Sequence, residues 1–169
     1  MLADLGVQWA IVGHSEHRKI CKHTDFDIGS KVKHAIDNKM NVILCVGESI
    51  VERMGGKTNI VTTTMLESVS KWIKPDEWRH IVICYEPVWA MGDLDTQVDP
   101  VEVQNAAVNM RDWVRNVVHK EIGQNIRIIY GGEVDAMKAR NLINMRDIDG
   151  FLVGKQSLTQ EFAWIVNAV

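Results

Sequence analysis

Five short apolar runs rich in β-branched residues recur along this chain of 169 residues, and helical stretches separate them. The runs cover residues 9–12, 41–46, 80–85, 126–130 and 150–153. Most of them lack polar alternation, which is typical of strands that helices cover on both faces. A strand–helix order repeated in this way predicts a parallel sheet built from right-handed βαβ units.

Signals for helix starts lie between the apolar runs. Thr24 followed by Asp27 predicts a capping box at the start of one helix. Asp99 followed by Pro100 supplies a cap and a first-turn proline for another. Helices are expected over residues 28–38, 57–72, 100–119, 136–144 and 160–169.

The chain shows no linker rich in Pro, Gly or Ser, so residues 1–169 are expected to form a single domain. Periodicity alone leaves a doubly wound sheet open as an alternative. The first apolar run is not followed by a G-x-G-x-x-G turn, which weakens that alternative.

Composition and charge argue against several classes of protein. The net charge of −3 and the pI near 6.1 argue against a dedicated nucleic-acid surface. No apolar stretch approaches the roughly 20 residues of a membrane helix, and the N-terminus lacks the pattern of a signal peptide. Cys21, Cys45 and Cys84 form no C-x-x-C pair, so free thiols in a cytoplasmic protein are expected.

In parallel α/β proteins, chemistry gathers at the carboxyl ends of the strands. The segments at those positions are Gly13-His14-Ser15-Glu16, Cys45-Val46-Gly47-Glu48, Tyr85-Glu86-Pro87-Val88-Trp89-Ala90, Tyr130-Gly131-Gly132 and Gly150-Phe151-Leu152-Val153-Gly154. In this order and spacing they resemble triosephosphate isomerase from its fourth strand to its last helix. The resemblance covers essentially the whole chain. It implies an α/β fold, an incomplete TIM (β/α) barrel with about five parallel βα units.

The resemblance also implies catalytic residues. As is known for the family, the glutamate that corresponds to Glu86 is the base that moves a proton between adjacent carbons. His14 corresponds to the neutral electrophile that polarises the carbonyl, and a dry site suits both roles. Glu16 resembles a supporting acid near the site. An equally good interpretation of Glu16 is a helix-start carboxylate beside backbone N–H groups.

A mobile lid and a phosphate site are implied in the same way. Residues 87–96 resemble the lid that closes over the substrate and excludes water. The lid residues singled out are Pro87, Trp89, Asp95 and Thr96. Gly92, Gly132 and Gly154 resemble positions where backbone N–H groups hold a phosphate, helped by the start of a short helix near Leu158.

Several residues depart from the family pattern. At the lid tip, Leu94 and Asp95 replace a glycine and a lysine. At the phosphate loops, Glu133 replaces a serine and Lys155 replaces a glycine. Glu133 places a carboxylate beside the phosphate, whereas Lys155 can pair with Glu133, fill the pocket or strain the turn. The expected net effect is weaker phosphate binding.

The resemblance begins at the family's fourth strand, so the first three βα units are expected to be absent. An asparagine and a lysine of the family's active site, and its main dimer-forming loop, belong to those units. Five open strands would leave two sheet edges and one sheet face uncovered. We therefore expect a homodimer in which two chains cover each other's open barrel.

Three functional hypotheses follow. The first is a triosephosphate isomerase, with glyceraldehyde 3-phosphate and dihydroxyacetone phosphate as nominal substrates and with very weak or lost activity. The second is a catalytically inactive barrel fragment that self-assembles or binds a sugar phosphate. The third is another phosphate-binding barrel enzyme, which the Glu86-Pro87-Val88-Trp89 run disfavours. The expected ligand is a small phosphorylated sugar, and the sequence gives no sign of a cofactor, a metal site, or a nucleic-acid or membrane partner.

Overall fold

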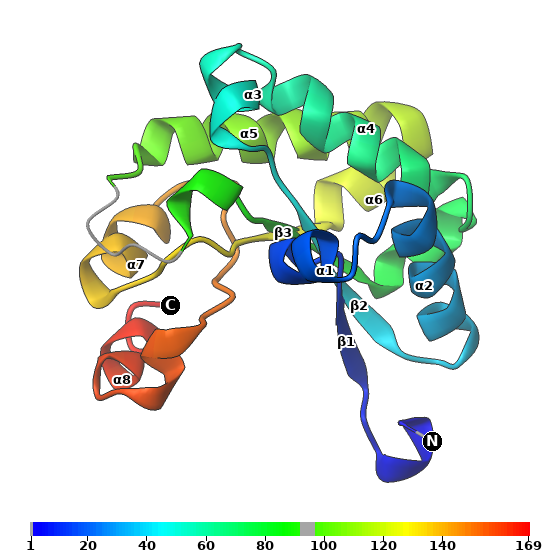
Figure 1. Ribbon diagram of the computed structural model, residues 1–169, viewed down its shortest axis with the longest axis horizontal. Coiled ribbons are helices and arrows are strands. Elements are labelled where there is room, and N and C mark those ends of the chain that lie inside the picture. Colours follow the sequence, from blue (N-terminus) through cyan, green and yellow to red (C-terminus); the bar gives the residue numbers. More distant parts are fainter. Residues whose placement is uncertain (1, 92–96) are drawn as a thin grey trace.

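A sheet of four parallel strands in the order β1-β2-β3-β4 forms the centre of the computed structural model, which describes residues 2–91 and 97–169 (Figure 1). The strands are β1 (Trp9–Val12), β2 (Asn41–Val46), β3 (Ile81–Tyr85) and β4 (Arg127–Tyr130). Each crossover moves the chain one strand along, which is the topology of a barrel segment. The predicted α/β class and partial TIM barrel are confirmed, and the barrel is not closed.

The fifth predicted strand, over residues 150–153, is reduced to one β-bridge between Tyr130 and Phe151. Around this bridge, Tyr130 N–H donates to Gly150 O (3.0 Å) and Leu152 N–H donates to Tyr130 O (2.9 Å). One step earlier, the Asp149 carboxylate accepts from Ile128 N–H (2.7 Å). Asp149 N–H also donates to Ile128 O (2.8 Å), so one side-chain and one backbone hydrogen bond join the segments here in place of regular strand pairing.

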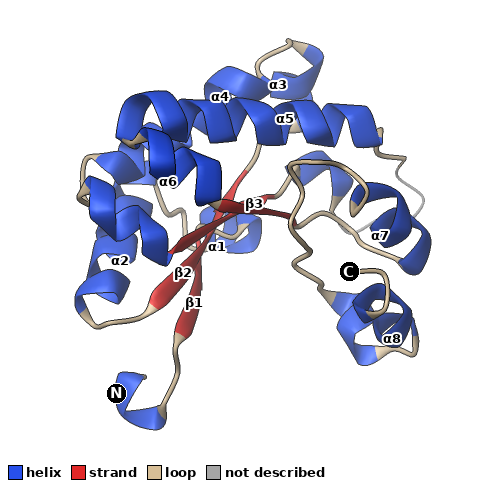
Figure 2. Cartoon of the chain, turned by 180° about the vertical axis from the view of Figure 1, so that it is seen from behind, coloured by secondary structure: helices blue, strands red, loops and turns tan. Residues whose placement is uncertain are grey.

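Helices follow the strands and cover one face of the sheet (Figure 2). They are α1 (Ser15–Ile20), α2 (Asp25–Asp37), α3 (Ile50–Met54), α4 (Thr58–Ser70), α5 (Pro100–Trp113), α6 (Lys120–Asn125), α7 (Ala136–Leu142) and α8 (Glu161–Val166). Short 3₁₀ turns cover Ala3–Leu5, Pro75–His80, Val88–Ala90 and Lys155–Leu158. Helices α2, α4 and α5 pack against the sheet and against one another in that order. Among the described residues, no helix is both long enough and apolar enough to cross a membrane.

Both predicted helix caps are confirmed, although α2 begins at Asp25, before the expected residue 28. In the capping box of α2, Asp27 N–H donates to Thr24 Oγ1 (3.3 Å) and Thr24 N–H donates to Asp27 Oδ2 (2.8 Å). Helix α5 begins at Pro100, and the Asp99 carboxylate accepts from Val101 N–H (2.9 Å). Beyond Trp113, α5 continues as a π-helical turn over Val114–Val118, so the helical path ends at about the predicted place.

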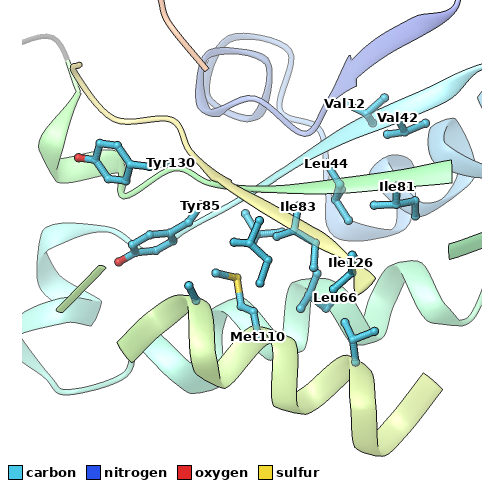
Figure 3. Packing of buried hydrophobic residues seen from close by; sticks show 14 of the residues in the cluster. Val12, Val42, Leu44, Leu66, Ile81, Ile83, Tyr85, Met110, Ile126 and Tyr130 are labelled. Atoms are coloured by element: carbon cyan, nitrogen blue, oxygen red, sulfur yellow. The ribbon is translucent and has the colours of Figure 1, made fainter. Parts of the chain in front are cut away.

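The two faces of the sheet are buried to different extents. On the helix side, Leu44, Ile83 and Tyr85 point toward Leu66 and Met110 and form the core (Figure 3). Because side chains alternate along a strand, every second residue of β1 faces the opposite side of the sheet from the buried Val12. On that face Trp9 is 38% exposed and Ile11 is 49% exposed. The side that would be the barrel interior is therefore partly open at β1.

Candidate active site

The loops that follow β1, β2, β3 and β4 meet at the carboxyl edge of the sheet, as expected for parallel strands. Backbone hydrogen bonds tie these loops together. Glu86 N–H donates to Val46 O (2.8 Å), and Gly131 N–H donates to Tyr85 O (2.8 Å). The residue after β3 is thereby fixed against the end of β2.

The predicted pair Glu86 and His14 is in direct contact. Glu86 Oε1 lies 2.9 Å from His14 Nε2, and the Glu86 side chain is only 2% exposed. The other carboxylate oxygen, Oε2, accepts from Ser15 N–H at 2.8 Å. Side chains that lie 72 positions apart in the sequence are thus brought together, because β1 and β3 both end at this edge.

The surroundings of His14 fix its tautomer. His14 is the N-cap of α1, and its Nδ1 accepts a hydrogen bond from Glu16 N–H (3.3 Å). An accepting Nδ1 carries no proton, so the proton of the neutral ring is on Nε2. Nε2 therefore carries its proton 2.9 Å from Glu86 Oε1, but this contact lacks hydrogen-bond geometry, and the buried Oε1 has no hydrogen-bond partner among the described residues.

Burial shifts both groups toward their neutral forms. Desolvation raises the pKa of Glu86 from 4.5 to about 7, opposed by the Ser15 backbone N–H and by the charge of Arg18. Desolvation lowers the pKa of His14, although Glu16 opposes that shift. The result is a neutral imidazole beside a carboxyl group that titrates near neutral pH, which suits general acid–base chemistry.

Gly47 allows the close approach that positions Glu86. A Cβ atom at Gly47 would lie 2.0 Å from the carbonyl oxygen of Glu86 and 2.5 Å from its carbonyl carbon. Both contacts are to backbone, so rotation of a side chain cannot relieve them. The sequence predicted no role for Gly47 beyond its place at a strand end. A glycine directly after a buried strand was the available signal.

Glu48 is fully buried and anchors the segment that follows Glu86. Its carboxylate accepts from the Tyr85 hydroxyl (3.1 Å to each oxygen) and from Trp89 Nε1–H (2.9 Å). Its carbonyl oxygen accepts from Val88 N–H (3.0 Å). The Arg53 guanidinium lies 4.1 Å from the centre of the Trp89 ring. No role for Glu48 was predicted from the sequence, although a glutamate at a strand end was the available signal.

The loop after β4 lies against the start of the lid segment. Glu133 N–H donates to Ala90 O (3.1 Å), which joins the two loops directly. A Cβ atom at Gly132 would lie 2.1 Å from the hydroxyl oxygen of Tyr130, so this glycine too allows a close approach. The Tyr130 hydroxyl is buried and has no hydrogen-bond partner among the described residues.

Comparison with known proteins agrees with this geometry. The family profile described as triosephosphate isomerase matches residues 1–169. The chain belongs to the triosephosphate isomerase family.

Three relatives show the extent of the match. The triosephosphate isomerase of Taenia solium is 44% identical over 169 residues, which is 99% of this chain and 67% of the relative. Those of Paracoccidioides lutzii and Aspergillus oryzae are 41% and 42% identical over 167 residues, which is 67% and 66% of their lengths. The chain therefore spans about two-thirds of the length of these relatives.

Glu16 lies in the first turn of α1, where the interpretation as a helix-start carboxylate placed it. Its side chain is exposed, and its backbone N–H is the donor to His14. The role of Glu16 as a supporting acid stays a prediction.

The second part of the predicted phosphate site lies beyond β4. Gly154 and Lys155 are exposed, and a Cβ atom at Gly154 would have no neighbour within 4 Å. The short helix predicted near Leu158 is the 3₁₀ turn Lys155–Leu158, so it begins at Lys155. Among the described residues, the only non-glycine residues with positive φ are Lys22 and Lys39. Lys155 therefore takes its place without left-handed backbone strain, which removes one of the three possibilities considered for it.

The structure describes only the start of the predicted lid. Pro87 precedes the 3₁₀ turn Val88–Ala90, and Met91 Sδ accepts from the Ser15 hydroxyl (3.2 Å). The remaining predicted lid and phosphate positions, Gly92, Leu94, Asp95 and Thr96, lie outside the described residues.

Proposed function

We propose that this chain catalyses the interconversion of glyceraldehyde 3-phosphate and dihydroxyacetone phosphate, with Glu86 as the base and His14 as the electrophile. The observation that carries the proposal is the contact of 2.9 Å between the buried Glu86 carboxylate and the imidazole of His14. A buried carboxyl group with a pKa of about 7 can take up and release a proton at neutral pH. Membership of the triosephosphate isomerase family supports the choice of substrate.

The chemistry needs no redox step. Since Glu86 and His14 contact each other directly, a substrate has to enter between them and replace this contact. The Glu86 carboxylate then takes a proton from the carbon next to the carbonyl group, and His14 Nε2–H donates a hydrogen bond to the carbonyl oxygen as it becomes negative. A proton also passes from the substrate's hydroxyl oxygen to the former carbonyl oxygen, with His14 Nε2 placed to give one proton and take the other. The same carboxyl group returns the proton taken from carbon to the neighbouring carbon. Atoms and electrons are conserved, and the aldose and ketose phosphates interconvert.

We also propose that turnover is very low. Glu133 places negative charge beside the loop expected to hold a phosphate, and Lys155 only partly offsets it. The open face at Trp9 and Ile11 admits water, which weakens electrostatic stabilisation of the transition state.

Isomerisation of glyceraldehyde 3-phosphate in a coupled assay tests the proposal, with Glu86→Gln purified in parallel. Loss of the base is expected to lower turnover by about 10²–10⁴-fold. Glu67→Gln is the matched control, because Glu67 is an exposed carboxylate on α4. Equal turnover in Glu86→Gln and in the unmodified chain would assign the activity to a contaminant and overturn the proposal.

The second candidate is an inactive barrel fragment that self-assembles or binds a sugar phosphate, and the exposed inner face at Trp9 and Ile11 favours it. We propose that two copies pair through this face, whether or not the chain is active. Light scattering at micromolar concentration is expected to show a dimer, and Ile11→Lys is expected to dissociate it. Val51→Lys is the control, since Val51 is 76% exposed on α3. A monodisperse monomer would overturn the pairing.

A cytoplasmic location belongs to the same proposal. Cys21, Cys45 and Cys84 are all free, which suits a reducing compartment. A small phosphorylated sugar is the proposed ligand.

A further inference from the structure

Arg18 joins three segments beside the candidate active site. Its side chain is only 19% exposed, although it carries a permanent charge. Arg18 Nε–H donates to the carbonyl oxygen of Gly13 at 2.8 Å. Its Nη1 lies 2.6 Å from Asp25 Oδ1, in the first turn of α2. The guanidinium therefore ties the turn after β1 to the start of the next helix.

Gly13 is the residue whose geometry directs the chain toward His14. It has φ +84°, a conformation that favours glycine. A Cβ atom at Gly13 would lie 2.9 Å from the carbonyl oxygen of Cys45 and 3.3 Å from Arg18 Nη2. The guanidinium thus packs against this turn, and its bond to Gly13 O fixes the peptide plane that leads into His14.

The turn held by Arg18 presents both donors that contact Glu86. One is Nε2–H of His14, and the other is the backbone N–H of Ser15. A change in the Gly13–His14 peptide plane would move both donors together. The position of the Glu86 carboxylate is therefore coupled to a guanidinium that does not itself bond to it.

Charge gives Arg18 a second effect on Glu86. The titratable groups around this carboxyl group include His14, Glu16 and Arg18 from the segment after β1 and Cys45 from β2. The positive charge of Arg18 lowers the pKa of Glu86 and so opposes burial, whereas Glu16 acts in the opposite direction.

We propose that Arg18 is a positioning residue for the proton-transfer pair, because its guanidinium holds the turn that presents His14 and Ser15 to Glu86 and supplies the positive charge beside that carboxylate. The catalytic meaning of this inference rests on the proposed function. Its structural content does not, since it concerns the ionisation of Glu86 in the chain without substrate.

The test is a titration of the Glu86 carboxyl carbon by ¹³C NMR in the 169-residue chain, with the signal assigned from its absence in Glu86→Gln. Arg18→Met removes the charge and is expected to raise the titration midpoint of Glu86 by roughly one pH unit. Arg18→Lys keeps the charge and is expected to leave the midpoint close to that of the unmodified chain. An unchanged midpoint in Arg18→Met would overturn the proposal, as would equal shifts in the two variants.

Asp25→Asn keeps the proposal testable if Arg18→Met does not fold. This change removes the negative partner of Arg18 and leaves the guanidinium charge less balanced, so the Glu86 midpoint is expected to fall. A midpoint that is unchanged or higher would overturn the proposal. The titration needs no turnover, so absence of isomerase activity would count against the proposed function and leave this inference to be decided by the Glu86 midpoints.

Discussion

At the β1 and β3 end of the candidate site, Glu86 is 2% exposed and each of its carboxylate oxygens has a donor nearby. At the end that follows β4, Gly154 and Lys155 are exposed, and a Cβ atom at Gly154 would meet no atom within 4 Å. We refer to these two regions as the proton-transfer half and the phosphate half. The first is fixed by backbone contacts and buried hydrogen bonds, whereas the second has free space around it.

This difference in packing indicates which positions of the site tolerate substitution. Substitutions in the proton-transfer half disturb buried polar groups or backbone, so they alter stability and chemistry together. Substitutions at Gly154 and Lys155 in the phosphate half meet solvent, so they alter ligand binding with little effect on folding. Of the departures from the family pattern, Lys155 is exposed and lies in the tolerant half, whereas Glu133 is half-buried and its backbone N–H donates to Ala90 O.

The largest expected effect concerns the ionisation of Glu86. The pKa of Glu86 is about 7 in the folded chain and 4.5 for a glutamate in water, the value expected after unfolding. Between pH 4.5 and pH 7, unfolding therefore releases a proton from this group. The free energy of unfolding therefore falls as pH rises from 4.5 to 7, by about 3 kcal/mol from this group. We expect Glu86→Gln to be more stable than the unmodified chain at pH 8, with the gap closing toward pH 4. Urea unfolding across this range measures the gap, and a gap independent of pH would contradict the prediction.

Alanine substitutions at Gly47 and at Gly154 give a direct comparison of packing in the two halves. Gly47→Ala places a methyl group against the backbone of Glu86 and is expected to cost about 2 kcal/mol in unfolding free energy. Gly154→Ala meets open space and is expected to cost less than about 0.5 kcal/mol. Denaturant unfolding of both variants is the measurement. Equal costs would show that the two halves do not differ in packing.

A smaller effect is expected at Glu48. Glu48→Gln keeps an acceptor for Tyr85 and Trp89 and loses the charge that strengthens both bonds, at a cost of about 1 kcal/mol. Glu67→Gln, an exposed change on α4, is the matched control with no measurable cost expected. The difference in urea midpoint between the variants gives the value. A Glu48→Gln variant as stable as the control would show that the buried carboxylate does not anchor the lid segment.

The smallest effect on stability is expected at Glu133, because the substitution leaves its backbone bond to Ala90 in place. Glu133→Ser restores the residue typical of the family and removes a negative charge beside the predicted phosphate site. If the proposed function holds, the KM for glyceraldehyde 3-phosphate is expected to fall about fivefold, which corresponds to about 1 kcal/mol of binding. Steady-state kinetics measures the KM, with thermal unfolding as the check on stability. An unchanged KM would remove Glu133 from the phosphate site.

Strand and helix order could be predicted from the sequence because local patterns specify them. The apolar runs over 9–12 and 41–46 coincide with β1 and β2, and the Thr24–Asp27 capping box starts α2 as expected. The run over 150–153 shows the limit of this reasoning. Its apolar pattern is that of a strand, whereas its pairing depends on Asp149 taking the N–H of Ile128, which is a contact between distant segments.

Local patterns in the sequence were enough to predict the α/β class, the residues at the strand ends and the resemblance that singled out His14 and Glu86. The fold was needed to see that these two side chains touch, that His14 Nδ1 accepts from Glu16 N–H, and that Gly47, Glu48 and Arg18 pack around the pair. The physical reason is that residue type and spacing set local conformation. Burial, hydrogen-bond partners and pKa depend on groups that the fold brings together from positions far apart along the chain.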